Sequence, residues 1–162
     1  MSLQPLDPGQ FWEVHVDWKK PVKYKVILEA GCNHDDSAHL YRILSRYSVY
    51  PFKSLYIGHT YNQCISVRLG QPDQKKRYAD FQVAYPKHSF WVSCGIVTIA
   101  NGNKTKKRIK DIETILIYTN QSEHSHNVSN VYKHGVTGSY HIENHGYRCG
   151  LPRELHLGFF VR

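Results

Sequence analysis

An arginine lies on the inner border of a predicted helix, where a cation needs a reason. Ile65, Arg68 and Leu69 fall at i, i+3 and i+4, so the guanidinium emerges beside the apolar stripe and not opposite it. A guanidinium carries a planar fork of donors that suits phosphate, and it stays charged at any working pH. Its position on the core side of the helix makes Arg68 a candidate functional residue.

A carboxylate occupies the middle of an apolar face in a second predicted helix, residues 104–119. Ile109 and Ile112 stand at i and i+3 of that face, and Glu113 takes the i+4 place. Burying a carboxylate costs free energy unless a cation or hydrogen bonds compensate it. Two partners fit. One is a divalent metal, because Mg²⁺ commonly binds one or two carboxylates together with waters and substrate phosphates. The other is a buried ion pair with Arg68.

The residues before Arg68 indicate a strand that is followed directly by the helix that carries Arg68. Residues 55–57 are aromatic or aliphatic, in keeping with a strand. Gly58 allows the backbone to turn sharply or another molecule to approach closely. Thr60 or Asn62 then caps the helix. The sequence therefore predicts a strand, a glycine turn and a helix in succession.

This succession resembles the second half of the motif of the GIY-YIG nuclease family. The first half is matched more weakly by residues 21–26, in which Tyr24 takes the place of the first tyrosine. Val22 and Lys23 replace the glycine and isoleucine of the family, and the two halves lie further apart than usual. The residues that match the second half are Tyr56, Ile57, Gly58, Thr60 and Arg68.

Residues further along the chain continue the resemblance. The family places a metal-binding glutamate on a helix after its third strand, followed by Leu-Ile and later by asparagine. Glu113, Leu116, Ile117 and Asn127 stand in that order, and Asn127 would support the site by hydrogen bonding. The histidine that often follows the family's arginine is replaced here by Pro72.

The resemblance implies an endonuclease that hydrolyses DNA phosphodiester bonds with Mg²⁺ or Mn²⁺ as cofactor. On this interpretation Glu113 holds the metal and Arg68 stabilises the charge of the transition state. Tyr24 or Tyr56 orients or deprotonates the attacking water, which for a base requires a lowered phenol pKa. His59 is the alternative base, because the unperturbed pKa of histidine lies near 6.5.

The charge of the chain fits a polyanionic partner. Lys+Arg number 21 and Asp+Glu 13, which gives a formal net charge of +8. DNA is therefore the expected partner, and Lys75, Lys76 and Arg77 are suited to contact its phosphates. A basic DNA- or RNA-binding module that keeps the scaffold without catalysis fits the same charge. Cutting both strands with one site per chain requires a homodimer or two successive nicks.

Length and composition indicate one domain, residues 1–162. The sequence shows no signal-like N-terminus and no apolar run near the roughly 18 residues of a membrane helix, so we expect a cytoplasmic protein that does not enter membranes. The cysteines form no C-x-x-C pair, and we expect reduced thiols rather than a zinc ribbon or a disulfide framework. The four are Cys32, Cys64, Cys94 and Cys149.

The expected fold is α+β, with a small mixed or antiparallel central sheet of three core strands flanked by helices. Alternation of apolar residues predicts strands over residues 11–18 and 22–30, and the most apolar run, residues 90–100, predicts a central strand. An insertion at residues 33–53 is predicted to be helical, because Leu40, Ile43, Leu44 and Tyr47 have helical spacing. Residues 1–10 are an irregular lead-in, and residues 131–162 are a C-terminal extension with additional strands.

Overall fold

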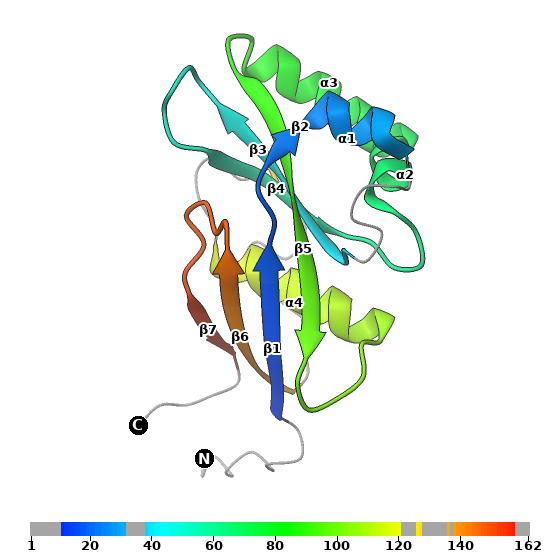
Figure 1. Cartoon of the computed structure of the whole chain (residues 1–162), viewed down its shortest axis with the longest axis vertical. Helices are drawn as coiled ribbons and strands as arrows, with labels where there is room; N and C mark the ends of the chain where they lie inside the picture. The colour runs from blue at the N-terminus through cyan, green and yellow to red at the C-terminus, as the bar shows by residue number, and fades with distance from the viewer. Residues whose placement is uncertain (1–10, 32–37, 121–125, 128–135, 137, 158–162) are drawn as a thin grey trace.

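The computed structural model describes residues 11–31, 38–120, 126–127, 136 and 138–157. They form an α+β fold with one mixed, curled sheet and four helices (Figure 1). The strands are β1 (Phe11–Trp18), β2 (Val22–Lys23), β3 (Leu40–Arg46), β4 (Lys53–His59), β5 (Ser89–Ile99), β6 (Ser139–Gly146) and β7 (Glu154–Leu157). The helices are α1 (Tyr24–Ala30), α2 (Ile65–Leu69), α3 (Pro72–Ala84) and α4 (Lys106–Thr119).

Strand β5 joins the two halves of the sheet. Its N-terminal part pairs antiparallel with β3, and its C-terminal part pairs antiparallel with β1. Beyond β3 lies β4, and beyond β1 lie β6 and β7, so the strand order is β4-β3-β5-β1-β6-β7, with the short β2 paired to β5. The pair β1–β6 is parallel. The long β5 therefore runs through both halves of the molecule (Figure 1).

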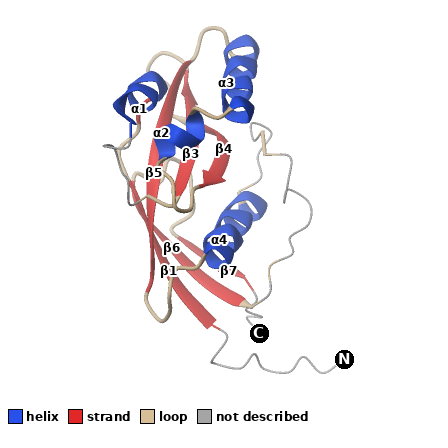
Figure 2. Ribbon diagram, turned by 90° about the vertical axis from the view of Figure 1, so that its right-hand side faces the viewer, coloured by secondary structure: helices blue, strands red, loops and turns tan. Residues whose placement is uncertain are grey.

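The helices cover the two halves of the sheet separately (Figure 2). Helices α1, α2 and α3 lie around the half that contains β3 and β4, and they share a buried cluster with these strands. Helix α4 lies against β1 and β6, where Ile109 and Ile112 pack with Val14 and Ile142. A polar cavity lies between α2, from the first half, and α4, from the second.

Several predictions of elements are confirmed. The α+β class is correct, the strands predicted at residues 11–18 and 90–100 are β1 and β5, and the helix predicted at residues 104–119 is α4. The predicted number of strands is too small, because the described sheet has seven strands and the prediction was three core strands. The lead-in at residues 1–10 lies outside the described residues.

The predicted helix within residues 33–53 is wrong, because Leu40–Arg46 is strand β3. This strand lies between β4 and β5, and every residue from Leu40 to Ser45 is buried. A strand covered on both faces has no alternation of apolar and polar residues. Its apolar positions matched the spacing of a helix by coincidence.

The strand predicted over residues 22–30 is also wrong beyond Lys23. Strand β2 has two residues, and helix α1 follows it directly. The buried residues of α1 are Tyr24 and Ile27, which are three apart as on a helical face. Gly31 ends the helix with a φ of 63°, a conformation that glycine adopts without steric cost.

The state of the cysteines differs in part from the expectation. Cys64 is disulfide-bonded, whereas Cys94 and Cys149 are not in a disulfide, so the expectation of reduced cysteines is wrong for Cys64. None of the described helices has both the length and the apolar character needed to cross a bilayer.

Candidate active site

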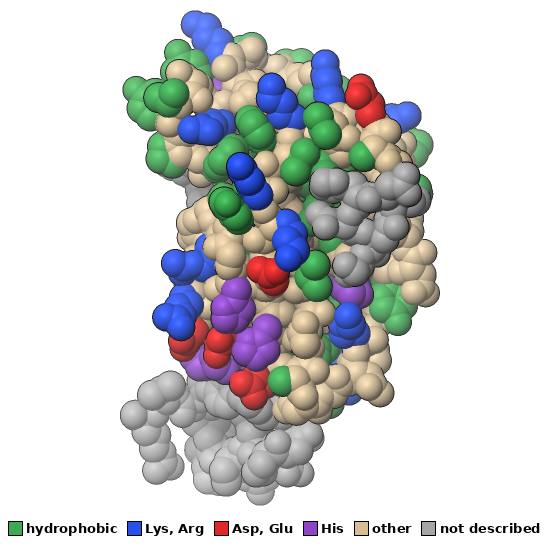
Figure 3. Space-filling model, viewed as in Figure 1, with side chains coloured by type: hydrophobic (Ala, Val, Ile, Leu, Met, Phe, Trp, Pro, Cys, Tyr) green, Lys and Arg blue, Asp and Glu red, His purple; other side chains and the backbone are tan. Residues whose placement is uncertain are grey.

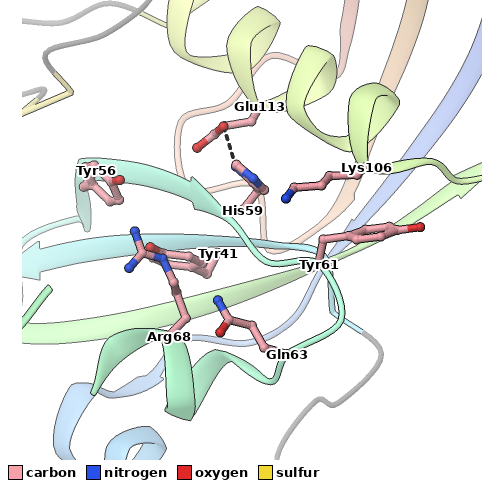
Figure 4. Close-up of a pocket in the computed structure, with 8 residues that line it drawn as sticks. All are labelled: Tyr41, Tyr56, His59, Tyr61, Gln63, Arg68, Lys106 and Glu113. Atoms are coloured by element: carbon pink, nitrogen blue, oxygen red, sulfur yellow. Dashed lines mark hydrogen bonds and ion pairs between the residues drawn. The ribbon is translucent and has the colours of Figure 1, made fainter. Parts of the chain in front are cut away.

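A polar cavity of about 260 Å³ lies between β3, β4, α2 and α4. Figure 4 shows the side chains that line it, which come from four elements and from the segment between β4 and α2. Every lining side chain carries a polar group, so the cavity suits a charged or strongly polar ligand. The lining residues are Tyr41, Tyr56, His59, Tyr61, Gln63, Arg68, Lys106 and Glu113.

The antiparallel hairpin of β3 and β4 positions two phenol rings. Tyr41 lies opposite Gly58 in the register, and its ring centroid is 6.1 Å from that of Tyr56. A Cβ atom added to Gly58 would lie 2.8 Å from Cε1 of Tyr41. Gly58 is therefore required for the close approach of the Tyr41 ring. It lies within β4 and not at a sharp turn, so the prediction of a backbone turn there is wrong.

The buried hydroxyl of Tyr41 has no hydrogen-bond partner among the described residues. Burial, followed by the neighbouring Tyr56, raises the pKa of Tyr41 well above its ordinary value. The phenol therefore keeps its proton and is a hydrogen-bond donor at the wall of the cavity. Because buried polar groups normally have a partner, this hydroxyl is suited to a water or ligand in the cavity.

Glu113 is bound to a histidine and not to an arginine. Nδ1 of His59 lies 2.7 Å from Oε2 of Glu113, and the Glu113 side chain is 12% exposed. The dashed line in Figure 4 marks this bond between β4 and α4. The alternative of an ion pair between Glu113 and Arg68 is therefore wrong. The carboxylate reaches the cavity wall, where it is available to a ligand.

The guanidinium of Arg68 is held in a bidentate arrangement. Its two terminal nitrogens donate to the two carboxylate oxygens of Asp73 at 3.0 Å each, and one of them also donates to Gln71. Asp73 lies in the first turn of α3 and its side chain is 55% exposed. Hydrogen bonding from Arg68 holds the pKa of Asp73 below its ordinary value. Arg68 lines the cavity, but its two terminal nitrogens are engaged by Asp73, which is not among the residues that line it.

Tyr24 does not reach the cavity, which corrects its predicted catalytic position. It lies on α1 with its ring stacked on Tyr78, the centroids being 3.9 Å apart and the planes 2° from parallel. Burial raises the pKa of Tyr24 to about 12. These contacts give Tyr24 a packing role, and the phenols that accompany Tyr56 in the cavity are those of Tyr41 and Tyr61.

Asn127 holds the edge of the sheet beside the cavity. Its Oδ1 accepts a hydrogen bond from the backbone N–H of Ile57 at 3.0 Å, and its Nδ2 donates to the carbonyl of Ile57 at 2.8 Å. Ile57 stands between Tyr56 and Gly58 on β4, the outermost strand. Asn127 is not among the lining residues, so it positions the strand and does not contact a ligand in the cavity.

The predicted basic run lies on α3, next to the cavity. The guanidinium of Arg77 is 4.0 Å from the centroid of the Tyr56 ring, a cation–π contact. Lys76 forms an ion pair with Asp80 at 3.0 Å, and Lys75 is exposed. Arg77 therefore extends the positive charge of Arg68 along the outer side of Tyr56.

Sequence reasoning missed four of the lining residues, namely Tyr41, Tyr61, Gln63 and Lys106. Tyr41 was hidden by the helical interpretation of β3. A strand interpretation would have placed its tyrosine across a short hairpin from the Tyr-Ile-Gly strand. The other three lie at the ends of elements or between them, where periodicity carries no signal.

Comparisons of the chain with models of protein families, with curated proteins and with solved structures find no match.

Proposed function

We propose that the chain is a metal-dependent endonuclease of the GIY-YIG type, which hydrolyses phosphodiester bonds in DNA. One observation carries the proposal: a single polar cavity gathers two phenols, an arginine, a glutamate and a histidine from β3, β4, α2 and α4. These residues are Tyr41, Tyr56, Arg68, Glu113 and His59.

The β3–β4 hairpin supports the assignment to this family. Tyr41 lies on the strand that pairs with Tyr56 and Gly58, so the two halves of the motif become neighbouring strands. With Tyr41 in place of Tyr24, no long insertion separates the halves. The order of the remaining residues, Arg68 on the next helix and then Glu113 on α4, stays as the resemblance requires.

Positive side chains of the cavity are suited to the phosphate of a DNA strand. The two terminal nitrogens of Arg68 already bind the two carboxylate oxygens of Asp73. Two oxygens of a phosphate group can accept hydrogen bonds from the same two nitrogens. Asp73 is exposed, so it can move aside when a phosphate binds. Lys106 lines the cavity on the α4 side, and Arg77 lies beside Tyr56 outside it.

Glu113 would hold the divalent metal, Mg²⁺ or Mn²⁺. The fit rests on a carboxylate at the wall of a polar cavity and on the buried Tyr41 hydroxyl that lacks a partner among the described residues. Mg²⁺ retains several waters and needs only one or two carboxylates. When bound, such an ion polarises the phosphate and stabilises the departing oxygen.

His59 is the residue best placed to accept the proton of the attacking water. An ionised carboxylate only accepts hydrogen bonds, so Nδ1 of a neutral His59 bears the proton donated to Glu113. This tautomer leaves the lone pair on Nε2 available as a base. Tyr41 has a raised pKa and retains its proton, so it acts by hydrogen bonding to water or phosphate.

Nicking of supercoiled plasmid DNA tests the proposal. Wild-type protein should nick the plasmid with Mg²⁺ and leave it intact with a chelator. Glu113→Gln should lower the rate at least about 100-fold while DNA binding persists, because the metal loses its carboxylate. Glu29→Gln, at an exposed position on α1, is the matched control and should keep the wild-type rate. Equal nicking by Glu113→Gln and wild type would refute the proposal.

A basic nucleic-acid-binding module without catalysis is the second candidate. The bidentate bond between Arg68 and Asp73 favours it, because this bond keeps the guanidinium occupied until Asp73 moves. Such a module would retard DNA in a gel with a strong salt dependence and leave the plasmid supercoiled. If the chain is a nuclease, its one cavity would cut one DNA strand in each reaction. A homodimer or a second nick would then complete a double-strand break.

A further inference from the structure

Histidines and acids make up one face of the sheet formed by β1, β6 and β7. The register places His15 beside Glu143, Asp17 beside His145, and His141 beside His156. Alternate residues of a strand share a face, so these side chains lie together. Figure 3 shows histidine and acidic side chains gathered over this part of the molecule. Helix α4 packs against the opposite face of the same strands.

Three ligand atoms on this face form a nearly equilateral triangle. Nδ1 of His15 lies 3.2 Å from Nε2 of His145 and 3.7 Å from Oε2 of Glu143, and the last two atoms are 3.4 Å apart. Tetrahedral zinc with bonds of about 2.0–2.1 Å separates its ligand atoms by about 3.4 Å. The centre of the triangle is about 2 Å from each of the three atoms, which is the length of such a bond.

We propose that His15, Glu143 and His145 bind a divalent transition-metal ion, with zinc as the best fit. Two imidazoles and one carboxylate are ligands that zinc accepts, whereas Mg²⁺ and Ca²⁺ prefer oxygen ligands throughout. The side chains of the three residues are 24–43% exposed, so an ion can reach them and solvent can supply a fourth ligand.

The surroundings support a cation at this position. Glu13 and Asp17 on β1 and Glu143 and Glu154 on β6 and β7 put four acidic groups on one face of a chain whose net charge is +8. Oε1 of Glu143 lies 4.0 Å from Nε2 of His141, so a third histidine faces the oxygen that the triangle does not use.

A neighbouring set, His141, Glu154 and His156, is less suited to one ion. Each histidine Nε2 lies 3.9 Å from Oε2 of Glu154. The two rings are stacked face to face, 4.4 Å apart and 4° from parallel, whereas the ring planes of His15 and His145 are 24° apart. Lone pairs in parallel ring planes run side by side and do not converge on one point. His156 therefore serves as a matched control on the same face.

Titration of the full chain, without an affinity tag, with Co²⁺ and Zn²⁺ tests the site. Co²⁺ should give the visible absorption of a tetrahedral complex at one equivalent, and Zn²⁺ should displace it. His145→Ala and Glu143→Gln should weaken binding at least about tenfold. His156→Ala should bind within about twofold of wild type, and so should Glu113→Gln, which removes the carboxylate of the active-site cavity. Circular dichroism of each variant verifies its fold.

Four results of the binding titrations would overturn the proposal, and one spectroscopic result would do the same. They are no tetrahedral absorption in wild type, full binding by both His145→Ala and Glu143→Gln, loss of binding in His156→Ala with retention in His145→Ala, or loss in Glu113→Gln. A thiolate-to-cobalt charge-transfer band would also contradict it, because that band would place the ion on a free cysteine such as Cys149. Plasmid nicking does not enter this test, so the metal site and the nuclease activity stand or fall separately.

Discussion

Replacing Gly58 with alanine should destabilise the fold and displace the Tyr41 ring from the cavity. The added Cβ would lie 2.5 Å from Oη and 2.8 Å from Cε1 of Tyr41. Tyr41 is completely buried, so either its ring or strand β4 must shift against packed neighbours to accept the added atom. Overpacking of this kind costs about 1–3 kcal/mol, and we expect the free energy of unfolding to fall by that amount.

Urea denaturation followed by tryptophan fluorescence measures this change, and Gly70→Ala is the matched control. Gly70 has φ −76° and ψ −9°, and a Cβ there would meet no atom closer than 3.4 Å. Alanine adopts this conformation without strain, so Gly70→Ala should stabilise the protein by about 0.4–1 kcal/mol. The two glycine substitutions are therefore expected to change stability in opposite directions.

A double-mutant cycle with Tyr41→Leu identifies the cause. If the clash with the ring is responsible, Gly58→Ala should cost less in the Tyr41→Leu background than in wild type, with a coupling of about 1 kcal/mol or more. Gly58→Ala with wild-type stability, or with the same cost in both backgrounds, would refute the close packing of Tyr41 on β4.

Two further predictions concern stability. Asn127→Ala removes both hydrogen bonds to Ile57 and should lower the free energy of unfolding in urea by about 1–3 kcal/mol; a loss below about 0.5 kcal/mol would contradict its role at the strand edge. Burial, and then Lys104, hold the pKa of His39 below its ordinary 6.5, so the unfolded chain binds this proton first as the pH falls. Stability from neutral His39 is thus complete above pH 6.5 and is lost as the pH falls through its lowered pKa. His39→Gln should make the decrease in unfolding free energy below pH 6.5 smaller. Equal decreases in both proteins would contradict this.

Much of the cavity could be predicted because several of its residues belong to strong local patterns. Arg68 and Glu113 each stood out against the apolar face of their own helix, Tyr56 belongs to the predicted strand, and His59 directly follows Gly58. Each signal lay within one element of the chain. Periodicity and composition are sufficient for features of this kind.

The remaining features depend on contacts between elements. Tyr41 was missed because β3 is covered on both faces and lacks alternation, and Tyr24 was misplaced because a short helix and a strand fit the same few apolar residues. The partner of Glu113 is His59, from a strand 54 residues away, and not Arg68 on the helix that follows that strand. The histidine and acid face depends on the parallel register of β1 and β6, which sequence patterns did not indicate.

The rate of Mg²⁺-dependent plasmid nicking by Tyr41→Phe and Tyr24→Phe tests the location of the active site most directly. Both substitutions remove one buried hydroxyl that lacks a partner among the described residues, but only Tyr41 lines the cavity. Tyr41→Phe should lose at least about tenfold in rate through the missing hydrogen bond in the transition state, whereas Tyr24→Phe should nick at the wild-type rate. Loss of activity in Tyr24→Phe with full activity in Tyr41→Phe would contradict a reaction in this cavity.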